Sequence, residues 1–157
     1  MSASEASLGT LEDEREVTRL VVLYNDCLDS GEFGRLGAEV FASDVVVDYN
    51  SITLKGSDAV ISHVAESMAQ FKTWAHLVSN VLLKSCDGDT AEVTAAQTVW
   101  IWVNEANPQR LDNWTDFVQL FFTWDRIERR PEGWRIVEHR TRMRGLPSSL
   151  TLGPMAA

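Results

Sequence analysis

The chain has 157 residues, of which 45% are hydrophobic and 24% charged, and its net charge at pH 7 is −9. This length and composition predict one globular domain with a single packed core, and they exclude disordered, collagenous and disulfide-framework proteins. The excess of acidic residues repels phosphate, so neither nucleic acid nor an anionic membrane is an expected partner. A neutral or modestly polar small molecule fits this charge better.

The ends of the chain differ in composition from its middle. Residues 1–10 are small and polar and lack the basic and apolar parts of a secretion signal, and residues 147–157 are rich in Ser, Ala, Gly and Pro. We therefore expect a flexible N-terminus over 1–10, a single domain over 11–146, a flexible tail over 147–157, and a cytoplasmic protein. Cys27 and Cys86 match no metal-binding spacing, and we expect both to be reduced and structural.

The first half of the sequence predicts helices. Apolar residues recur every three or four positions over 11–28, which predicts a helix that ends before Gly31, because glycine adopts the left-handed cap conformation. A shorter helix is predicted over 35–41, and the β-branched run over 45–49 predicts a strand. Ser57 is the expected N-cap of a third helix.

The second half predicts strands. Segments 75–85 and 90–103 alternate in polarity and are joined by a hairpin turn, and segments 117–129 and 134–144 are joined by a second turn. Helices followed by strands indicate an α+β fold, with three N-terminal helices packed on one face of a curved, mostly antiparallel sheet. Such a sheet, covered on one side, leaves a cone with an apolar mouth that suits a small molecule.

Asp29 and His76 are the residues best suited to proton transfer. Asp29 lies in the last turn of the first helix, where the helix dipole disfavours an acid, so it either caps the turn in solvent or has a compensating partner. His76 lies among apolar residues at the start of the first long strand, where it is either a core residue or a proton carrier. The two can form a pair in which the carboxylate fixes the imidazole tautomer.

Two tyrosines and two further histidines are the other polar candidates. Tyr24 lies within the apolar stripe of the first helix, and Tyr49 shares a strand face with two valines, so both hydroxyls can enter one cavity. His63 falls on the polar side of the third helix, and we set it aside. His139 alternates with charged residues on the last strand, and we keep it as a spare candidate.

Aromatic and basic residues gather in the predicted sheet. Trp100 and Trp102 share one face of their strand, and with Phe121 of the next strand they can line a large apolar cavity. Arg140 and Arg142 alternate on the last strand, which usually marks a solvated surface, but one of them can bind a substrate carboxylate or carbonyl. We take all five as candidate substrate-binding residues.

Several short strings follow one another along the chain: Tyr24-Asn25-Asp26-Cys27-Leu28-Asp29-Ser30-Gly31, Phe41-Ala42-Ser43-Asp44, Val47-Asp48-Tyr49, Gly56, His76 and Gly133-Trp134-Arg135-Ile136. In these strings the sequence resembles the SnoaL-like branch of the nuclear transport factor 2 superfamily, over residues 12–145. Within that branch it most resembles the scytalone dehydratase and bile-acid 7α-dehydratase group, with the hexachlorocyclohexane dehydrochlorinase as a relative of similar chemistry. The resemblance implies a cone-shaped fold and a reaction that needs no metal and no organic cofactor.

The resemblance also implies roles for four residues. Asp29 and His76 match the acid/base dyad, in which His76 takes a proton next to a carbonyl or leaving group. Tyr24 matches a tyrosine that donates to a substrate oxygen, and Tyr49 matches one that polarises a carbonyl through water. The stretch 98–102 departs from the pattern, because it has no ionisable side chain where the dehydratases place a further His or Asp.

Three functions are consistent with these residues. The leading one is a cofactor-independent lyase of the dehydratase type, acting on a hydrophobic oxygenated small molecule such as a polyketide, terpenoid or steroid-like intermediate. The second is a cyclase or double-bond isomerase of such an intermediate in a biosynthetic pathway. The third is a non-catalytic ligand-binding or dimerisation module. Because these folds leave one apolar sheet face outside the cone, we also expect a homodimer or homotrimer.

Overall fold

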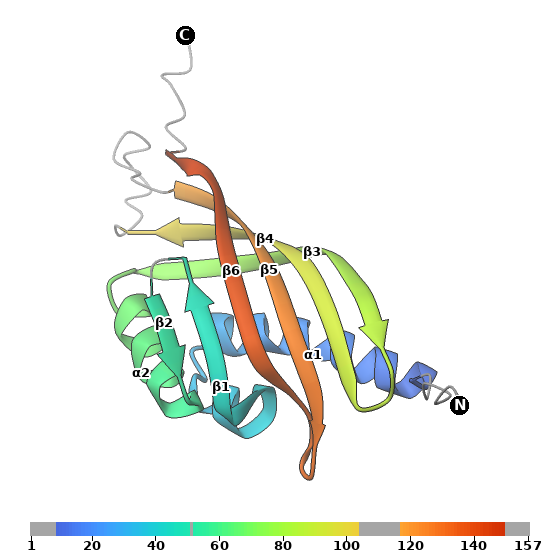
Figure 1. The fold of residues 1–157 in the computed structure, drawn as a ribbon. Helices are drawn as coiled ribbons and strands as arrows, with labels where there is room; N and C mark the ends of the chain where they lie inside the picture. Colours follow the sequence, from blue (N-terminus) through green and yellow to red (C-terminus); the bar gives the residue numbers. More distant parts are fainter. Residues whose placement is uncertain (1–8, 51, 104–116, 150–157) are drawn as a thin grey trace, which may run out of the picture.

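The computed structural model describes residues 9–50, 52–103 and 117–149. The elements follow in the order α1 (Leu11–Ser30), η1 (Leu36–Val40), β1 (Phe41–Tyr49), β2 (Ile52–Lys55), α2 (Ser57–Met68), β3 (Thr73–Cys86), β4 (Thr90–Trp102), β5 (Phe117–Arg130) and β6 (Gly133–Ser149) (Figure 1). Helices precede the long strands, as the sequence predicts, and the α+β class is confirmed. No helix in these described stretches is long and apolar enough to cross a membrane.

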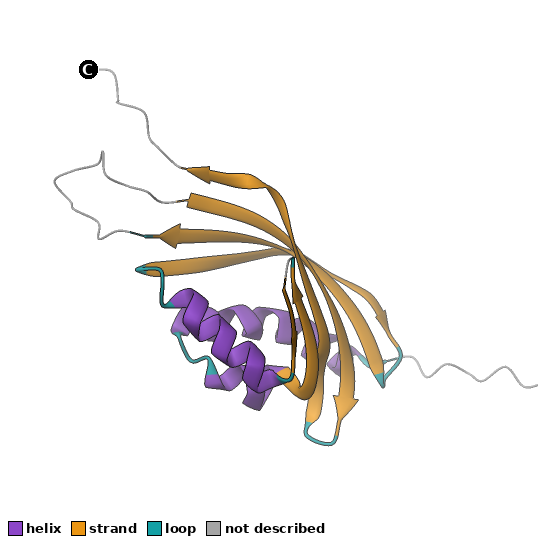
Figure 2. Cartoon of the chain, turned by 60° about the vertical axis from the view of Figure 1, so that its left-hand side comes forward, coloured by secondary structure: helices purple, strands orange, loops and turns teal. Residues whose placement is uncertain are grey.

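The six strands form one sheet in the order β2-β1-β6-β5-β4-β3. Neighbouring strands are antiparallel except β1 and β6, which are parallel. The sheet is strongly curved, and the helices lie on its concave side (Figure 2). Side chains alternate between the two faces of a strand, so every second residue of the long strands points toward the helices.

Helix α1 begins and ends where its local sequence supplies the caps. The Thr10 hydroxyl accepts a hydrogen bond from the Asp13 N–H at 3.1 Å, and the Asp13 carboxylate accepts one from the Thr10 N–H at 3.0 Å. This reciprocal pair is a capping box. At the other end Gly31 adopts a φ of 71° and donates to the Leu28 carbonyl at 3.2 Å, which confirms the predicted left-handed glycine cap.

Three details between the end of α1 and the start of α2 differ from the sequence-based expectation. Ser57 does not cap the helix: it is the first helical residue, and the cap position belongs to Gly56, whose φ of 87° favours glycine. Strand β2 has no counterpart in the sequence prediction, because it is only four residues long and lies at the sheet edge with mostly exposed side chains. The short helix expected over 35–41 is a single π-helical turn, and Phe41 already belongs to β1.

The hydrophobic core lies between α1, η1 and α2 and the concave face of the sheet. Its fully buried members come from helices and strands alike: Val17, Val21, Cys27, Leu36, Val40, Val45, Val47, Val60, Val93, Ile127 and Ile136. The start of α1 is tied to the sheet by polar contacts, since Asp13 accepts hydrogen bonds from the Arg129 guanidinium and from the Trp134 indole N–H. The core therefore fixes α1, and with it Tyr24 and Asp29, against strands β3 to β6.

The ends of the described chain are engaged with the fold. The Gly9 N–H donates to the Cys86 carbonyl at 3.2 Å, and β6 continues to Ser149. Residues 1–8 and 150–157, which make up most of the two expected flexible ends, lie outside the described residues.

Candidate functional site

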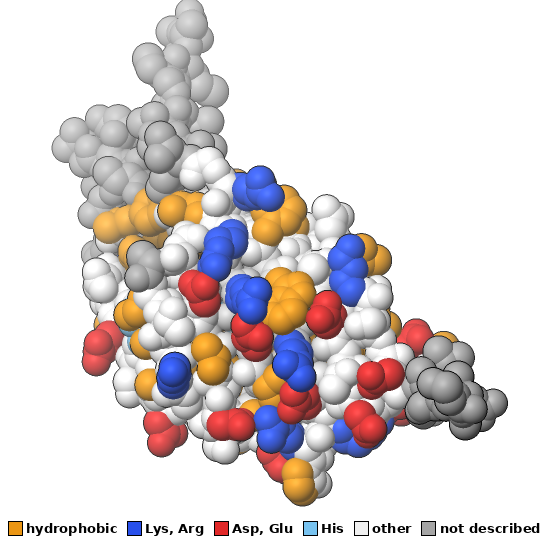
Figure 3. Space-filling model, in the orientation of Figure 1, with side chains coloured by type: hydrophobic (Ala, Val, Ile, Leu, Met, Phe, Trp, Pro, Cys, Tyr) orange, Lys and Arg blue, Asp and Glu red, His pale blue; other side chains and the backbone are white. Residues whose placement is uncertain are grey.

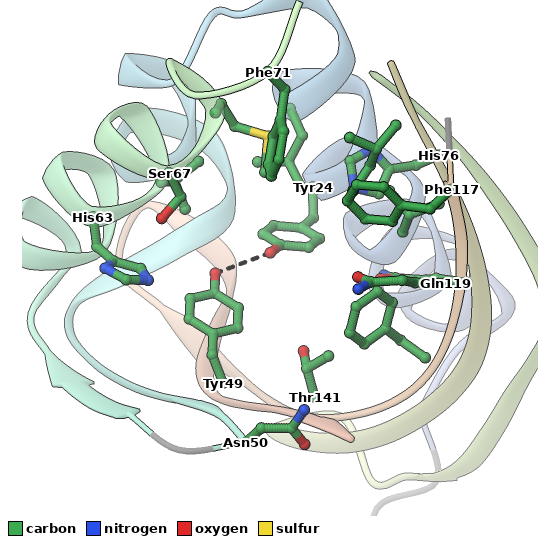
Figure 4. A pocket seen from close by; sticks show the side chains of 17 residues that line it. Tyr24, Tyr49, Asn50, His63, Ser67, Phe71, His76, Phe117, Gln119 and Thr141 are labelled. Atoms are coloured by element: carbon green, nitrogen blue, oxygen red, sulfur yellow. Dashed lines mark hydrogen bonds between the residues drawn. The ribbon is translucent and has the colours of Figure 1, made fainter. Parts of the chain in front are cut away.

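A cavity of about 290 Å³ lies between the helices and the concave face of the sheet. Its wall combines apolar side chains with a small number of polar ones: Tyr24, Leu28, Tyr49, Asn50, His63, Val64, Ser67, Met68, Phe71, His76, Gln97, Val99, Ile101, Phe117, Gln119, Phe121 and Thr141. Figure 4 shows His63 on one side of this space and His76 on the other, with Tyr24 and Tyr49 between them. A mostly apolar hollow with few convergent polar groups is typical of a small-molecule site.

Asp29 and His76 form a hydrogen-bonded pair at the edge of the cavity. The Asp29 carboxylate lies 2.6 Å from His76 Nδ1 and also accepts from the His76 backbone N–H at 3.0 Å. The imidazole is 5% exposed and the carboxylate 34% exposed, so the acid faces solvent while the ring faces the interior. Because a carboxylate only accepts, Nδ1 carries the proton and Nε2 of the neutral ring is left as a basic nitrogen.

The end of α1 and the start of β3 place this pair. The Trp74 indole N–H donates to the Leu28 carbonyl at 2.8 Å, which satisfies a carbonyl in the last turn of the helix. Trp74 also stacks on Phe33, with ring centroids 6.5 Å apart. This contact brings Asp29, the residue after Leu28, alongside the backbone of His76, two residues after Trp74.

Tyr24 and Tyr49 share a hydrogen bond inside the cavity, with their hydroxyl oxygens 2.9 Å apart (Figure 4). Burial raises the pKa of Tyr49 to about 12, and burial together with Tyr49 raises the pKa of Tyr24 well above its usual value. Both hydroxyls therefore keep their protons at neutral pH. Since one hydroxyl donates to the other, the second proton of the pair remains available to a ligand.

Several further polar side chains to which the sequence assigned no role reach the cavity, among them His63 and Gln97. His63, set aside on the sequence pattern, lines the wall, and its ring stacks on Tyr49 with centroids 5.9 Å apart. Gln97 on β4 is 4% exposed, and within the described part of the chain its Nε2 has no hydrogen-bond partner. A buried donor without a partner costs about 1–3 kcal/mol, so a ligand oxygen that accepts from Gln97 would recover that free energy.

A second buried Asp–His pair lies beneath the tyrosines. Asp125 on β5 and His139 on β6 are each 1% exposed, and the Asp125 carboxylate lies 2.6 Å from His139 Nδ1. On the other side of the ring, Nε2 lies 2.8 Å from the Thr141 hydroxyl, and Thr141 lines the cavity. His139, the spare candidate of the sequence analysis, is thus linked to the site through Thr141.

The structure places four of the five expected substrate-binding residues away from this cavity. Phe121 lines it, but Trp100 and Trp102 lie on the convex face of β4, where their rings stack on each other at 6.4 Å. The concave face of that strand carries the smaller Val99 and Ile101 instead, because these pack closely beneath the helices. The two tryptophans therefore do not line this cavity, and their contact with a ligand stays a prediction.

The two arginines also lie on the convex face. Arg140 donates to Glu138 at 2.8 Å and lies over the Trp124 ring, 4.5 Å from its centroid. Arg142 donates to Asp48 at 2.6 Å and holds the pKa of that carboxyl below its usual value. Figure 3 shows this face with basic, acidic and hydrophobic side chains interleaved. Neither arginine lines this cavity; both line a second hollow on the convex face, and their contact with a substrate stays a prediction.

Within the described ranges 9–50, 52–103 and 117–149, no three His, Cys, Asp or Glu side chains are placed to hold one metal ion. The polar groups of the cavity are instead hydroxyls, imidazoles and carboxamides. These groups can donate, accept or move a proton, and they can orient an oxygenated ligand.

Comparison with known proteins places the chain in a family. A candidate scytalone dehydratase from Novosphingobium aromaticivorans is similar in structure, with a TM-score of 0.73 and 18% identity over 91% of each chain. A hexachlorocyclohexane dehydrochlorinase from Novosphingobium barchaimii has a TM-score of 0.73 and 17% identity, over 94% of this chain and 96% of that one. A candidate dehydratase of the NTF2-like family from Streptomyces avermitilis has a TM-score of 0.73 and 19% identity, over 86% of this chain and 98% of that one.

At these identities the structural likeness establishes the fold. No protein with a curated function matches the sequence. The family model of the SnoaL-like domain, however, matches residues 9–140, which is most of the chain. The chain therefore belongs to the SnoaL-like domain family and has the nuclear transport factor 2-like fold expected from its sequence.

Proposed function

We propose that this chain is a cofactor-independent lyase that uses His76 to remove a proton next to a carbonyl and expels a leaving group from the adjacent carbon. The observation that carries the proposal is the Asp29–His76 pair, whose imidazole is nearly buried at the edge of an apolar cavity. The substrate is a hydrophobic, oxygenated small molecule, because the cavity wall is mostly apolar with a few hydroxyl, imidazole and carboxamide groups. The dehydratases and the dehydrochlorinase among the structural relatives support an elimination.

The first step is the transfer of a substrate proton to His76. Asp29 holds the proton on Nδ1, so Nε2 accepts the new proton and the resulting imidazolium is stabilised by the carboxylate at 2.6 Å. A positioned general base contributes about 10²–10⁴-fold to such a step. The electron pair of the broken C–H bond moves toward the carbonyl oxygen.

The tyrosine pair meets the charge that develops on that oxygen. One of the two hydroxyl protons is used in the Tyr24–Tyr49 hydrogen bond at 2.9 Å, and the other can be donated to the substrate. Because burial raises the pKa of both groups, they stay protonated and act as neutral donors rather than as bases. A preorganised donor of this kind is worth about 10²–10³-fold.

The second step completes the elimination. The electron pair returns from the oxygen to form the carbon–carbon double bond, and the carbon–oxygen bond of the leaving group breaks. Departing hydroxide takes the proton from the His76 imidazolium, so that product and water leave together and the imidazole returns to its neutral form. If the imidazolium instead returns its proton to another carbon, the same residues perform a double-bond isomerisation.

The test uses a simple β-hydroxy ketone of suitable size, the aldol adduct of benzaldehyde and acetone. Its dehydration gives benzalacetone, whose conjugated absorbance is followed directly, and mass spectrometry confirms the loss of one water. We expect the wild type to accelerate this reaction and His76→Ala to lose at least about 10²-fold in kcat/KM. Leu77→Ala changes the neighbouring residue on the opposite face of β3 and is the matched control.

The outcomes separate the three functions. The aldol adduct has no double bond that can move, so an isomerase is identified with a β,γ-unsaturated ketone, whose double bond would shift into conjugation with the carbonyl without a change of mass. Saturable binding of the ketone without formation of any product, in both the wild type and His76→Ala, would identify a binding module and overturn the lyase proposal.

We also propose that two copies of the chain associate through the convex face of the sheet. Large hydrophobic side chains are exposed there, with Leu77 55%, Leu120 40% and Phe122 43% exposed. Exposed apolar side chains grouped on one sheet face are typical of an association surface. The exposed apolar side chains on the convex face support this proposal, and measurement of the protein's mass in solution tests it.

A further inference from the structure

A chain of three hydrogen-bonding side chains runs from the core to the cavity wall. Asp125 Oδ1 lies 2.6 Å from His139 Nδ1, and His139 Nε2 lies 2.8 Å from Thr141 Oγ1. The carboxylate and the imidazole are each 1% exposed, and Thr141 is 8% exposed and lines the cavity. Thr141 is therefore the only member of this trio that a ligand can touch.

The β5–β6 hairpin sets this arrangement and the surrounding rings hold it. Asp125 pairs with His139 in the strand register, and Thr141 follows two residues later on the same concave face. The His139 ring is packed against Tyr24 at 4.9 Å, Tyr49 at 5.8 Å and Phe41 at 6.3 Å between ring centroids. The imidazole has no room to turn away from its two partners.

A buried pair of this kind is not explained by stability alone. Replacing a buried ionisable pair with well-packed apolar residues is often neutral or stabilising. The pair does, however, fix a tautomer. By fixing which ring nitrogen of His139 carries the proton, the Asp125 carboxylate also fixes which atom donates in the hydrogen bond between His139 and Thr141.

The direction follows from the donors and acceptors. Asp125 only accepts, so Nδ1 of His139 carries a proton and donates it. In the neutral ring Nε2 is then an acceptor, and it accepts a hydrogen bond from the Thr141 hydroxyl. The Thr141 oxygen therefore turns only lone pairs toward the cavity, whereas the tyrosine pair and Gln97 Nε2 offer donors.

We propose that Thr141, held in this state by His139 and Asp125, is the acceptor that selects a substrate carrying a hydroxyl group. This inference builds on the proposed function: the cavity then offers donors for the carbonyl oxygen of the substrate and an acceptor for its hydroxyl, which defines the substrate class as a hydroxy ketone. Thr141 is the specificity-determining residue, and His139 and Asp125 are positioning residues. Figure 4 shows Thr141 directed into the same space as Tyr49 and Gln119.

Binding of three matched ligands tests the proposal without an elimination step. Benzylacetone, its para-hydroxy derivative and its para-methoxy derivative share one skeleton, and none has a leaving group next to the ketone. Dissociation constants are measured by calorimetry at a pH of about 8, where an ordinary imidazole is neutral. We expect the phenol to bind the wild type about 3- to 10-fold more tightly than either of the other two ligands.

Variants of Thr141 separate the hydrogen bond from packing. Thr141→Val keeps the shape and removes the hydroxyl, so it should erase the preference for the phenol while leaving the binding of benzylacetone unchanged. Thr141→Ser retains the hydroxyl and should retain the preference. A phenol preference that survives Thr141→Val, or that disappears only in His76→Ala, would overturn the proposal, because another acceptor would then bind the hydroxyl.

A separate measurement tests the positioning role of His139 and Asp125. Nitrogen-15 NMR of the three histidines should show that His139 carries its proton on Nδ1 alone. Asp125→Asn, whose amide can accept or donate, should populate the other tautomer and weaken the phenol preference in parallel. A proton on Nε2 of His139 in the wild type would contradict the assignment. Since none of these ligands has a leaving group to eliminate, the binding results stay decisive if the lyase assay fails, and the lyase assay stays decisive if the phenol preference is absent.

Discussion

Replacement of Asp29 by asparagine is the sharpest perturbation of the proposed mechanism, because it removes the charge and keeps the shape. The carboxamide oxygen of the introduced side chain can still accept from the His76 backbone N–H, which Asp29 contacts at 3.0 Å. What is lost is the carboxylate that fixes the proton on Nδ1 and that stabilises the imidazolium formed during proton transfer. The substitution therefore tests chemistry and leaves the architecture in place.

The magnitude follows from the geometry of the pair. With an Nδ1–Oδ1 distance of 2.6 Å, the two charge centres lie about 4 Å apart, and unit charges at that distance attract by about 4 kcal/mol near a protein surface. Asp29 is 34% exposed, so we halve this value to about 2 kcal/mol for solvent screening, which corresponds to about 30-fold in rate. Partial loss of the correct tautomer adds to this, and we expect kcat to fall by about 10²- to 10³-fold.

The assay is dehydration of the benzaldehyde–acetone aldol adduct, with circular dichroism to confirm that each variant is folded. Asp26→Asn is the matched control, since it is the same substitution one turn earlier on α1, at a side chain that is 59% exposed and contacts Arg35. If Asp29→Asn keeps kcat within about threefold of the wild type, the carboxylate does not assist His76 and the dyad mechanism is wrong.

Three other parts of the structure give predictions of their own. Gln97→Leu should weaken the binding of benzylacetone and leave the melting temperature unchanged or higher, because it removes a buried donor that has no partner in the described chain; a lower melting temperature with unchanged binding would contradict this. Hydrogen bonds from the Thr10 backbone and from Arg129 hold the pKa of Asp13 well below its usual value of 3.8, so its stabilising contribution is present above that pH and is lost as the pH falls through the folded-state value. Melting temperatures recorded from neutral to acidic pH should thus decline less steeply in Asp13→Asn than in the wild type, and equal slopes would refute the assignment. Phe122→Glu should lower the solution mass measured by light scattering without changing dehydration, and an unchanged mass would exclude the convex face as the association surface.

The sequence predicted the elements well because their hydrophobic periods are strong. Helix α1 carries an uninterrupted apolar stripe that ends at a left-handed glycine, and the long strands alternate over many residues. The pairing of Asp29 with His76 was one of the alternatives that the residues left open, and the resemblance to the dehydratases favoured it. Strand β2 escaped prediction because four mostly exposed residues at a sheet edge have no period to detect.

The face of a strand was harder to predict than the strand itself. Alternation separates Trp100 and Trp102 from Val99 and Ile101, but it does not say which set faces the helices, and bulk suggested the tryptophans. Val99 and Ile101 face the helices because side chains pack closely there and the smaller residues fit. His63 was missed for a related reason, because the cavity lies along the flank of α2 and so draws on a residue outside its apolar stripe.

The second Asp–His pair depends on an irregularity that no periodic pattern contains. At the turn of the β5–β6 hairpin, Arg130 pairs with Gly133, and Ile127 with Ile136. If that register continued, Asp125 would face Glu138. A bulge between Arg126 and Ile127 shifts the register by one residue and places Asp125 opposite His139.

The central claim is that His76 removes a proton next to a carbonyl in this cavity. Hydrogen–deuterium exchange at the carbons beside the ketone of benzylacetone, followed by proton NMR in heavy water, measures that step alone and needs no leaving group. We predict that the wild type accelerates exchange well above the buffer rate, that Leu77→Ala matches the wild type, and that His76→Ala is at least about 10²-fold slower. Exchange at the buffer rate in the wild type, or equal acceleration by His76→Ala, would contradict the claim.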